Sequence, residues 1–77
     1  MNSSLRFVSV DDSNSVVVYR ILPHKIDGME IKVAVATIRS QDDEFIMINM
    51  MTDPPSEMAF SDFELAGMFC QAAFIRP

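Results

Sequence analysis

The chain has 77 residues, of which 49% are apolar and 22% are charged, and its formal net charge is −5. This composition excludes a disordered chain, which needs low hydrophobicity and high net charge, and the single cysteine excludes an internal disulfide. The negative charge argues against direct binding to nucleic acid or to an anionic membrane and favours a basic partner surface, unless the acidity serves only solubility.

One domain over residues 1–77 is expected from the length. A single thiol and the absence of a secretory pattern predict a cytoplasmic protein. No run approaches the roughly 20 apolar residues of a membrane helix. With one cysteine and one histidine, the chain has too few ligands for a structural zinc site, and we predict neither a metal nor a cofactor.

Two strands are predicted in the first third of the chain. Residues 5–10 partly alternate between apolar and polar, and residues 15–22 are β-branched and apolar on both faces. The short polar side chains of residues 11–14 favour a turn between them. Pro23 is expected to end the second strand, because proline cannot donate to a central ladder.

Two more strands are predicted after a loop over residues 23–30, which contains the tight-turn pair Asp27-Gly28. Residues 31–39 alternate well, and residues 44–51 are nearly all apolar. The predicted strands are joined by turns at residues 11–14 and 40–43 and by the loop over residues 23–30. We therefore expect a four-stranded antiparallel meander.

A helix is predicted near the C-terminal end, after residues 52–56, where two prolines break regular structure. Ser61 is the predicted N-cap, and Glu64 follows three residues later as in a capping box. The helix should reach Phe74 or Ile75. The predicted fold class is thus α+β, with the helix packed on one face of the sheet.

Strands 15–22 and 44–51 and the helix carry more apolar surface than one core requires. A sheet with one solvated face should alternate, and a helix on a sheet needs an apolar stripe of only about 100°. One interpretation is a homodimer interface or a groove for a partner; the other is that the strands curl around the helix and hide it. The predicted interface residues are Phe63, Met68, Ala72 and Ile75.

Acidic residues gather in two of the predicted turns, which a meander places at the same end of the sheet. These carboxylates could dock on a basic protein surface, imitate nucleic-acid phosphates or hold a divalent cation, or they are simply solvated. A calcium site is the weakest of these, since the spacing does not match a calcium loop. The predicted partner-binding residues are Asp11, Asp12, Asp42, Asp43 and Glu44.

His24 and Cys70 are the single histidine and the single cysteine of the chain, and both are candidates for a catalytic role. A catalytic histidine needs an orienting acid and a nucleophile or substrate nearby, and no such set is visible, so His24 is expected to be an exposed loop residue. Reactive cysteines lie at helix N-termini or beside cations, and Cys70 does neither, so it is expected in the core. We therefore predict that the chain is not an enzyme.

These features predict a non-enzymatic, homodimeric protein-binding module, either an inhibitor or a regulator. It would occupy a basic surface of a partner protein, in one form a nucleic-acid-binding surface. In general style the organisation resembles small single-domain inhibitors encoded by phages and mobile elements. Two alternatives stay open: an assembly subunit recruited through the apolar outer face of the helix, and a small-ligand or enzyme domain that uses His24.

Overall fold

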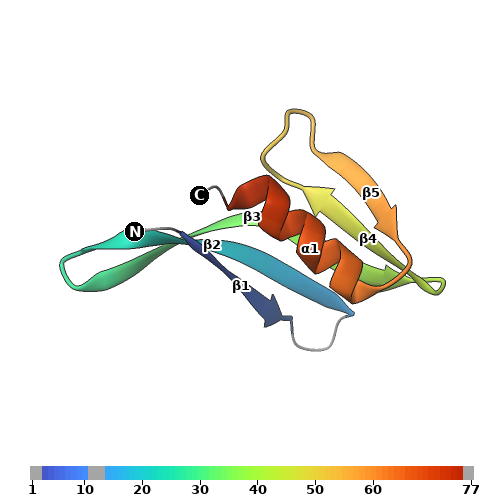
Figure 1. Ribbon diagram of the computed structural model, residues 1–77, viewed down its shortest axis with the longest axis horizontal. Coiled ribbons are helices and arrows are strands. Elements are labelled where there is room, and N and C mark those ends of the chain that lie inside the picture. The colour runs from blue at the N-terminus through green and yellow to red at the C-terminus, as the bar shows by residue number, and fades with distance from the viewer. Residues whose placement is uncertain (1–2, 11–13, 76–77) are drawn as a thin grey trace.

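The computed structural model describes residues 3–10 and 14–75, which form one antiparallel sheet and one helix (Figure 1). Neighbouring strands in the sequence are neighbours in the sheet, and all four pairs are antiparallel. The predicted α+β meander is confirmed, but with five strands rather than four. The elements are β1 (Ser4–Ser9), β2 (Ser15–Ile26), β3 (Met29–Gln41), β4 (Glu44–Asn49), β5 (Ser56–Phe60) and α1 (Phe63–Phe74).

The fifth strand, β5, is the element that the sequence patterns missed. It pairs with β4 from Asn49↔Ser56 to Phe45↔Phe60. Its five residues directly follow a proline pair, and so short a run shows no convincing alternation. The Phe60 ring lies 5.6 Å from the ring of Phe69 in α1, so β5 contributes to the core.

The strands β2 and β3 project beyond the sheet as a long hairpin arm (Figure 1). Pro23 lies inside β2, and the prediction that it ends the strand is wrong. The β2–β3 register shifts between Ile21 and Lys25, and proline is tolerated where a ladder is interrupted in this way. At the tip, Asp27 and Gly28 have φ values of 53° and 75°, as expected for the predicted tight turn.

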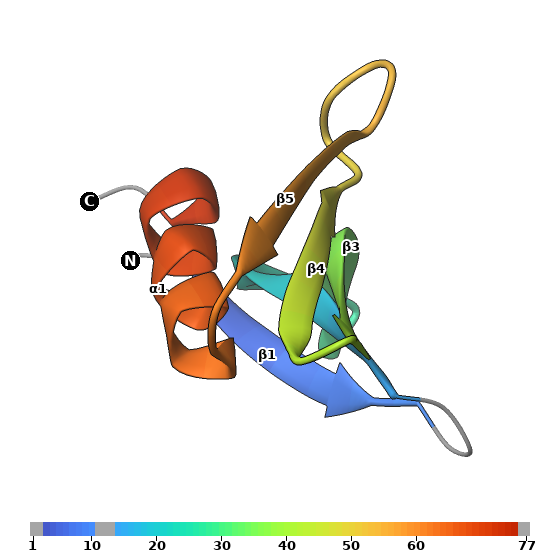
Figure 2. The ribbon, with the colours of Figure 1, turned by 90° about the vertical axis from the view of Figure 1, so that its right-hand side faces the viewer.

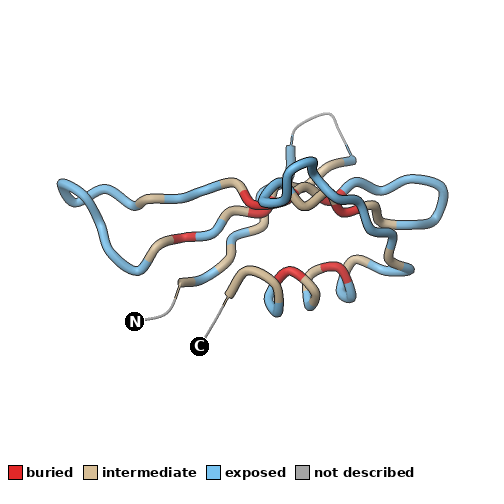
Figure 3. Tube along the Cα trace, turned by 90° about the horizontal axis from the view of Figure 1, so that it is seen from above, coloured by how far each residue is buried: buried red, intermediate tan, exposed pale blue. Residues whose placement is uncertain are grey.

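The core lies between one face of the sheet and α1, which runs along that face (Figures 2 and 3). Cys70 is fully buried, as predicted, and its Sγ lies 3.6 Å from Sδ of Met47. Burial raises the pKa of the Cys70 thiol, which disfavours the reactive thiolate. The buried cluster consists of Val18, Val35, Ala36, Ile38, Met47, Ala66 and Cys70.

A bulge in β3 brings two consecutive residues into this core. Val18 pairs with Ala36, but the next residue, Tyr19, pairs with Ala34, so Val35 is the extra residue. Val35 and Ala36 are both almost fully buried, at 1% and 0% exposure. A bulge increases the local twist of a strand, which helps the sheet to curve along α1.

The helix begins one residue later than expected. Asp62 is the N-cap, and its Oδ1 accepts a hydrogen bond of 2.8 Å from the N–H of Leu65. The prediction of Ser61 as the cap is therefore wrong, and Glu64 stands one position too early for a capping box. Both Ser and Asp are favoured at this position, and Asp62 also adds negative charge to the positive end of the helix dipole. The helix ends at Phe74, as predicted.

The molecule is more extended than a typical domain of its size. Its radius of gyration is 13.0 Å, against about 11.5 Å expected from chain length. Its accessible surface is 5443 Å², against about 4,700 Å² for a monomer of this mass. The helix also leaves apolar side chains exposed, with Leu65 at 44% and Met68 at 61%. In the described part of the chain the sheet therefore does not close over α1. No helix among the described residues has the length and apolar character that crossing a membrane requires, and α1 has only 12 residues.

Candidate functional site

The β3–β4 turn, at one end of the sheet, carries three of the acidic residues singled out from the sequence. The N–H of Ser40 donates a hydrogen bond of 3.0 Å to the carbonyl of Asn14, so Asn14 lies beside the end of β3. Asp11 and Asp12 are outside the described residues. Of the predicted partner-binding residues, the structure therefore places Asp42, Asp43 and Glu44, and all three are exposed.

The β3–β4 turn holds two aspartates in the left-handed region. Gln41 pairs with Glu44, so Asp42 and Asp43 form the whole loop, and their φ values are 50° and 63°. Two-residue turns of this type favour Asn-Gly or Asp-Gly, because a side chain at positive φ is strained. The other such turn, at the arm tip, has glycine at its second position. The acidic turn keeps a second carboxylate there instead.

Replacing Asp43 with glycine is expected to raise the free energy of unfolding by about 0.5–1 kcal/mol, because glycine adopts positive φ without strain. Urea unfolding followed by circular dichroism measures the change. The control is Asp43→Ala, which removes the same charge but keeps a Cβ. It should not stabilise the protein, and equal stabilisation by both substitutions would show that charge repulsion, rather than backbone strain, is the cost at this turn.

The charges of the acidic turn are not neutralised within the described residues. Arg39, the nearest cation along β3, donates from Nη2 to Oε1 of Gln41 at 2.9 Å. The ion pair that the structure shows is elsewhere in the sheet, where Arg6 contacts Glu30 at 2.6 Å and lowers the pKa of that carboxyl group through a hydrogen bond. Three exposed carboxylates thus remain available to an external cation.

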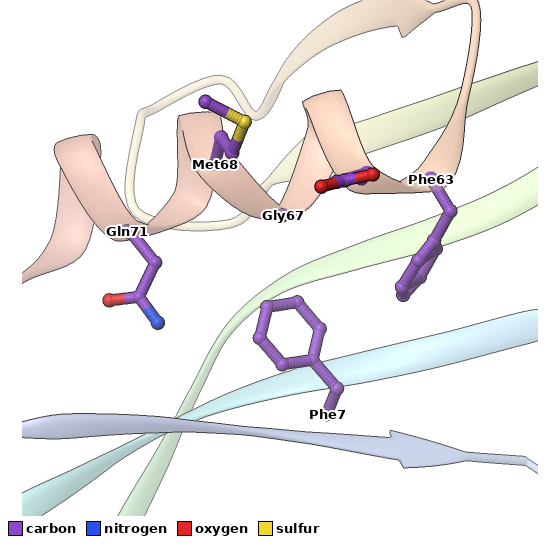
Figure 4. A pocket seen from close by; sticks show the side chains of 6 residues that line it. Phe7, Phe63, Gly67, Met68 and Gln71 are labelled. Atoms are coloured by element: carbon purple, nitrogen blue, oxygen red, sulfur yellow. The ribbon is translucent and has the colours of Figure 1, made fainter.

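A second candidate surface is an open apolar groove of about 280 Å³ between α1 and β1 (Figure 4). The rings of Phe7 and Phe63 lie in this space, 5.9 Å apart and edge to face, while Met68 projects from the helix. Gly67 presents no side chain, and a Cβ there would lie 3.9 Å from Cζ of Phe7. The residues lining the groove are Phe7, Phe63, Glu64, Gly67, Met68 and Gln71.

The four predicted interface residues do not form one surface. Phe63 and Met68 line the groove, but Phe63 is half-buried and its ring also packs 5.9 Å from Phe45, so it serves the core as well. Ala72 is exposed and Ile75 is half-buried, and neither lines the groove. Their role in an interface stays a prediction.

Sequence reasoning missed Phe7 and Gly67 as groove residues. The sequence did hold a signal for each: Phe7 alternates with polar Arg6 along β1, and an isolated glycine inside a helix often marks a close approach. Neither signal says which two elements lie side by side. That depends on where α1 crosses the sheet.

His24 and Cys70 do not share a site, because Cys70 is buried between α1 and the sheet. His24 is exposed in the β2–β3 arm and lines neither the groove nor a second hollow of about 290 Å³ near the end of α1. Arg20 and Asn49 are among the polar residues of that second hollow. Within residues 3–10 and 14–75, no group of three or more His, Cys, Asp or Glu side chains is placed to hold a metal ion.

Comparison of the chain with protein-family models, with curated proteins and with solved structures gives no significant match.

Proposed function

We propose that this chain is a non-enzymatic protein-binding module that occupies a basic surface of a partner protein. The observation that carries the proposal is the pair Asp42-Asp43, two exposed aspartates at left-handed positions with no cation bound to them among the described residues. Backbone strain that persists on a surface turn is a reason to look for a function of the side chains that cause it.

The charge pattern supports this function physically. Exposed carboxylates that no internal cation neutralises create a negative field, which accelerates encounter with a positive surface and disfavours acidic partners. Nucleic-acid-binding proteins expose clustered lysine and arginine, so their binding surfaces have the chemistry that this end of the sheet complements. In its specific form, the proposal is an inhibitor or regulator that covers such a surface.

The test is capture of a partner from native lysate by the immobilised chain, followed by titration of the purified partner. The variant Asp42→Asn/Asp43→Asn/Glu44→Gln removes three charges, and asparagine tolerates the left-handed turn. We expect its affinity to fall roughly 10-fold or more, and wild-type binding to weaken as salt rises. The matched control Asp27→Asn/Asp53→Asn/Glu57→Gln also loses three charges and should bind like wild type.

The second candidate function is an assembly subunit recruited through α1. It is favoured by the exposure of Leu65 and Met68 on the helix, at 44% and 61%. Binding through this face should persist at high salt and fail in Met68→Glu. Capture that survives the neutralised acidic turn but fails in Met68→Glu would overturn the proposed role of the acidic end.

A further inference from the structure

The outer edge of β1 has no neighbour within the described residues. β1 pairs only with β2 and forms one edge of the sheet. The N–H of Val10 donates to the carbonyl of Ser15 at 3.0 Å, which assigns the even-numbered residues of β1 to the ladder with β2. Because antiparallel strands alternate, the backbone N–H and C=O groups of Leu5, Phe7 and Ser9 point away from β2, toward the open edge.

This edge lacks the features that normally protect an edge strand. Such strands carry charged side chains or prolines that prevent pairing with another chain. Residues Ser4–Ser9 contain no proline and no acid, and their one charge, Arg6, is engaged by Glu30. The opposite edge, β5, contains Glu57 and directly follows Pro54-Pro55. The contrast marks β1 as the edge that is suited to pairing.

The apolar groove lies along the same edge. Leu5 and Phe7 alternate onto the face of the sheet that packs against α1, and Phe7 lines the groove together with Gly67 (Figure 4). A strand added to β1 would therefore run beside the flank of the helix and cover this apolar opening. Strand addition of this kind takes its affinity from main-chain hydrogen bonds and its specificity from pockets for alternate side chains.

We propose that β1 pairs antiparallel with β1 of a second copy of this chain, about a two-fold axis at Phe7. The two five-stranded sheets then form one continuous sheet. Phe7 lies opposite Phe7 of the second copy, and Leu5 lies opposite Ser9. The interface is self-complementary, as a two-fold dimer requires. The dimer does not use the acidic β3–β4 turn, which lies two strands away from β1.

The register of β1 favours a second copy as the occupant. With the two-fold axis at Phe7, the outward-facing residues Leu5, Phe7 and Ser9 of one copy lie opposite Ser9, Phe7 and Leu5 of the other, so each outward N–H meets an outward carbonyl. Arg6 lies opposite the neutral Val8, so no like charges oppose each other across the pair.

The exposed area is consistent with an unfilled interface. The chain exposes 5443 Å², which exceeds the expected monomer value by roughly 700 Å². Each partner in a standard protein interface buries about 800 Å².

The test uses sedimentation equilibrium of the full chain and of Ser9→Pro. Wild type is expected to sediment at twice the chain mass of 8.7 kDa. Proline at position 9 removes an N–H that points to the open edge and spares the ladder with β2, so it should raise the dimer dissociation constant about 100-fold. Ser9→Ala keeps the N–H and should dimerise like wild type.

Amide hydrogen exchange shows whether β1 itself is the interface. In wild type the outward amides of Leu5 and Phe7 should be protected, and in Ser9→Pro they should exchange rapidly. The inward amides of Arg6 and Val8 should stay protected in both proteins, which shows that β1 still pairs with β2.

Two results would overturn the proposed dimer: a wild-type monomer at about 100 μM with rapidly exchanging Leu5 and Phe7 amides, or a Ser9→Pro dimer with β1–β2 intact. The first result would mean that β1 does not pair with a second copy, and a strand of another protein would then be the candidate to pair with this edge. The variant with the neutralised acidic turn should still dimerise, so failure of the acidic-end proposal and failure of the dimer are distinguishable.

Discussion

Replacing Ile38 with alanine is expected to lower the free energy of unfolding by about 3–4 kcal/mol, because the substitution removes a buried side chain and leaves a cavity. Ile38 is 2% exposed in the central strand β3, where it pairs with Val16 on one side and Met47 on the other. A domain of this size has only about 4–12 kcal/mol of total stability. Urea unfolding followed by circular dichroism should therefore show a large fall in the midpoint.

The matched control is Ile26→Ala, the same substitution at the tip of the arm, where the side chain is 60% exposed. This change should alter stability by no more than about 0.5 kcal/mol. Equal losses at the two positions would contradict the location of the core on the α1 side of the sheet.

The second large effect is expected from Ala66→Leu. Ala66 is fully buried on the face of α1 that packs against the sheet, in the same cluster as Ala36 and Cys70. These small side chains allow the helix to approach the sheet closely, and added methylene groups in a packed core strain it. We expect a loss of about 2–3 kcal/mol in the free energy of unfolding.

Ala72→Leu is the control for this prediction, because Ala72 lies on the same helix and is exposed. It should leave the unfolding midpoint nearly unchanged, since leucine and alanine have similar helix propensities. If Ala66→Leu were as stable as Ala72→Leu, α1 could not pack as closely against the sheet as described, and the groove between α1 and β1 would have a different shape.

The two proposals combine into one mode of action. In the proposed dimer, β1 lies at the centre and each acidic β3–β4 turn remains on the outside, so the assembly presents two separate acidic ends. A dimer of this kind can engage two basic sites of one partner, and the second contact then forms at a high effective concentration. The Ser9→Pro variant should consequently bind a repeated or dimeric partner more weakly than wild type, although its acidic turn is unchanged.

Local signals in the sequence were sufficient for the main elements of this fold. Alternation over residues 5–10 and 31–39, together with the apolar runs over residues 15–22 and 44–51, predicted the four longest strands. The Asp27-Gly28 turn, the helix end at Phe74 and the burial of Cys70 followed from residue chemistry alone. The meander also placed the turns beside Asn14 and Ser40 at one end, since consecutive antiparallel strands alternate in direction.

Only the tertiary structure decided the features that depend on a neighbour. β5 is too short to reveal a period, and it forms because β4 offers it an edge. Pro23 stays within β2 because the β2–β3 register shifts there, and adjacent Ser61 and Asp62 are both good caps, so packing of α1 selects between them. The groove exists because small buried side chains set the helix close to the sheet while glycine leaves its flank open toward β1. Composition predicted an excess of apolar surface, but the distance between two elements far apart in the sequence determined where that surface lies.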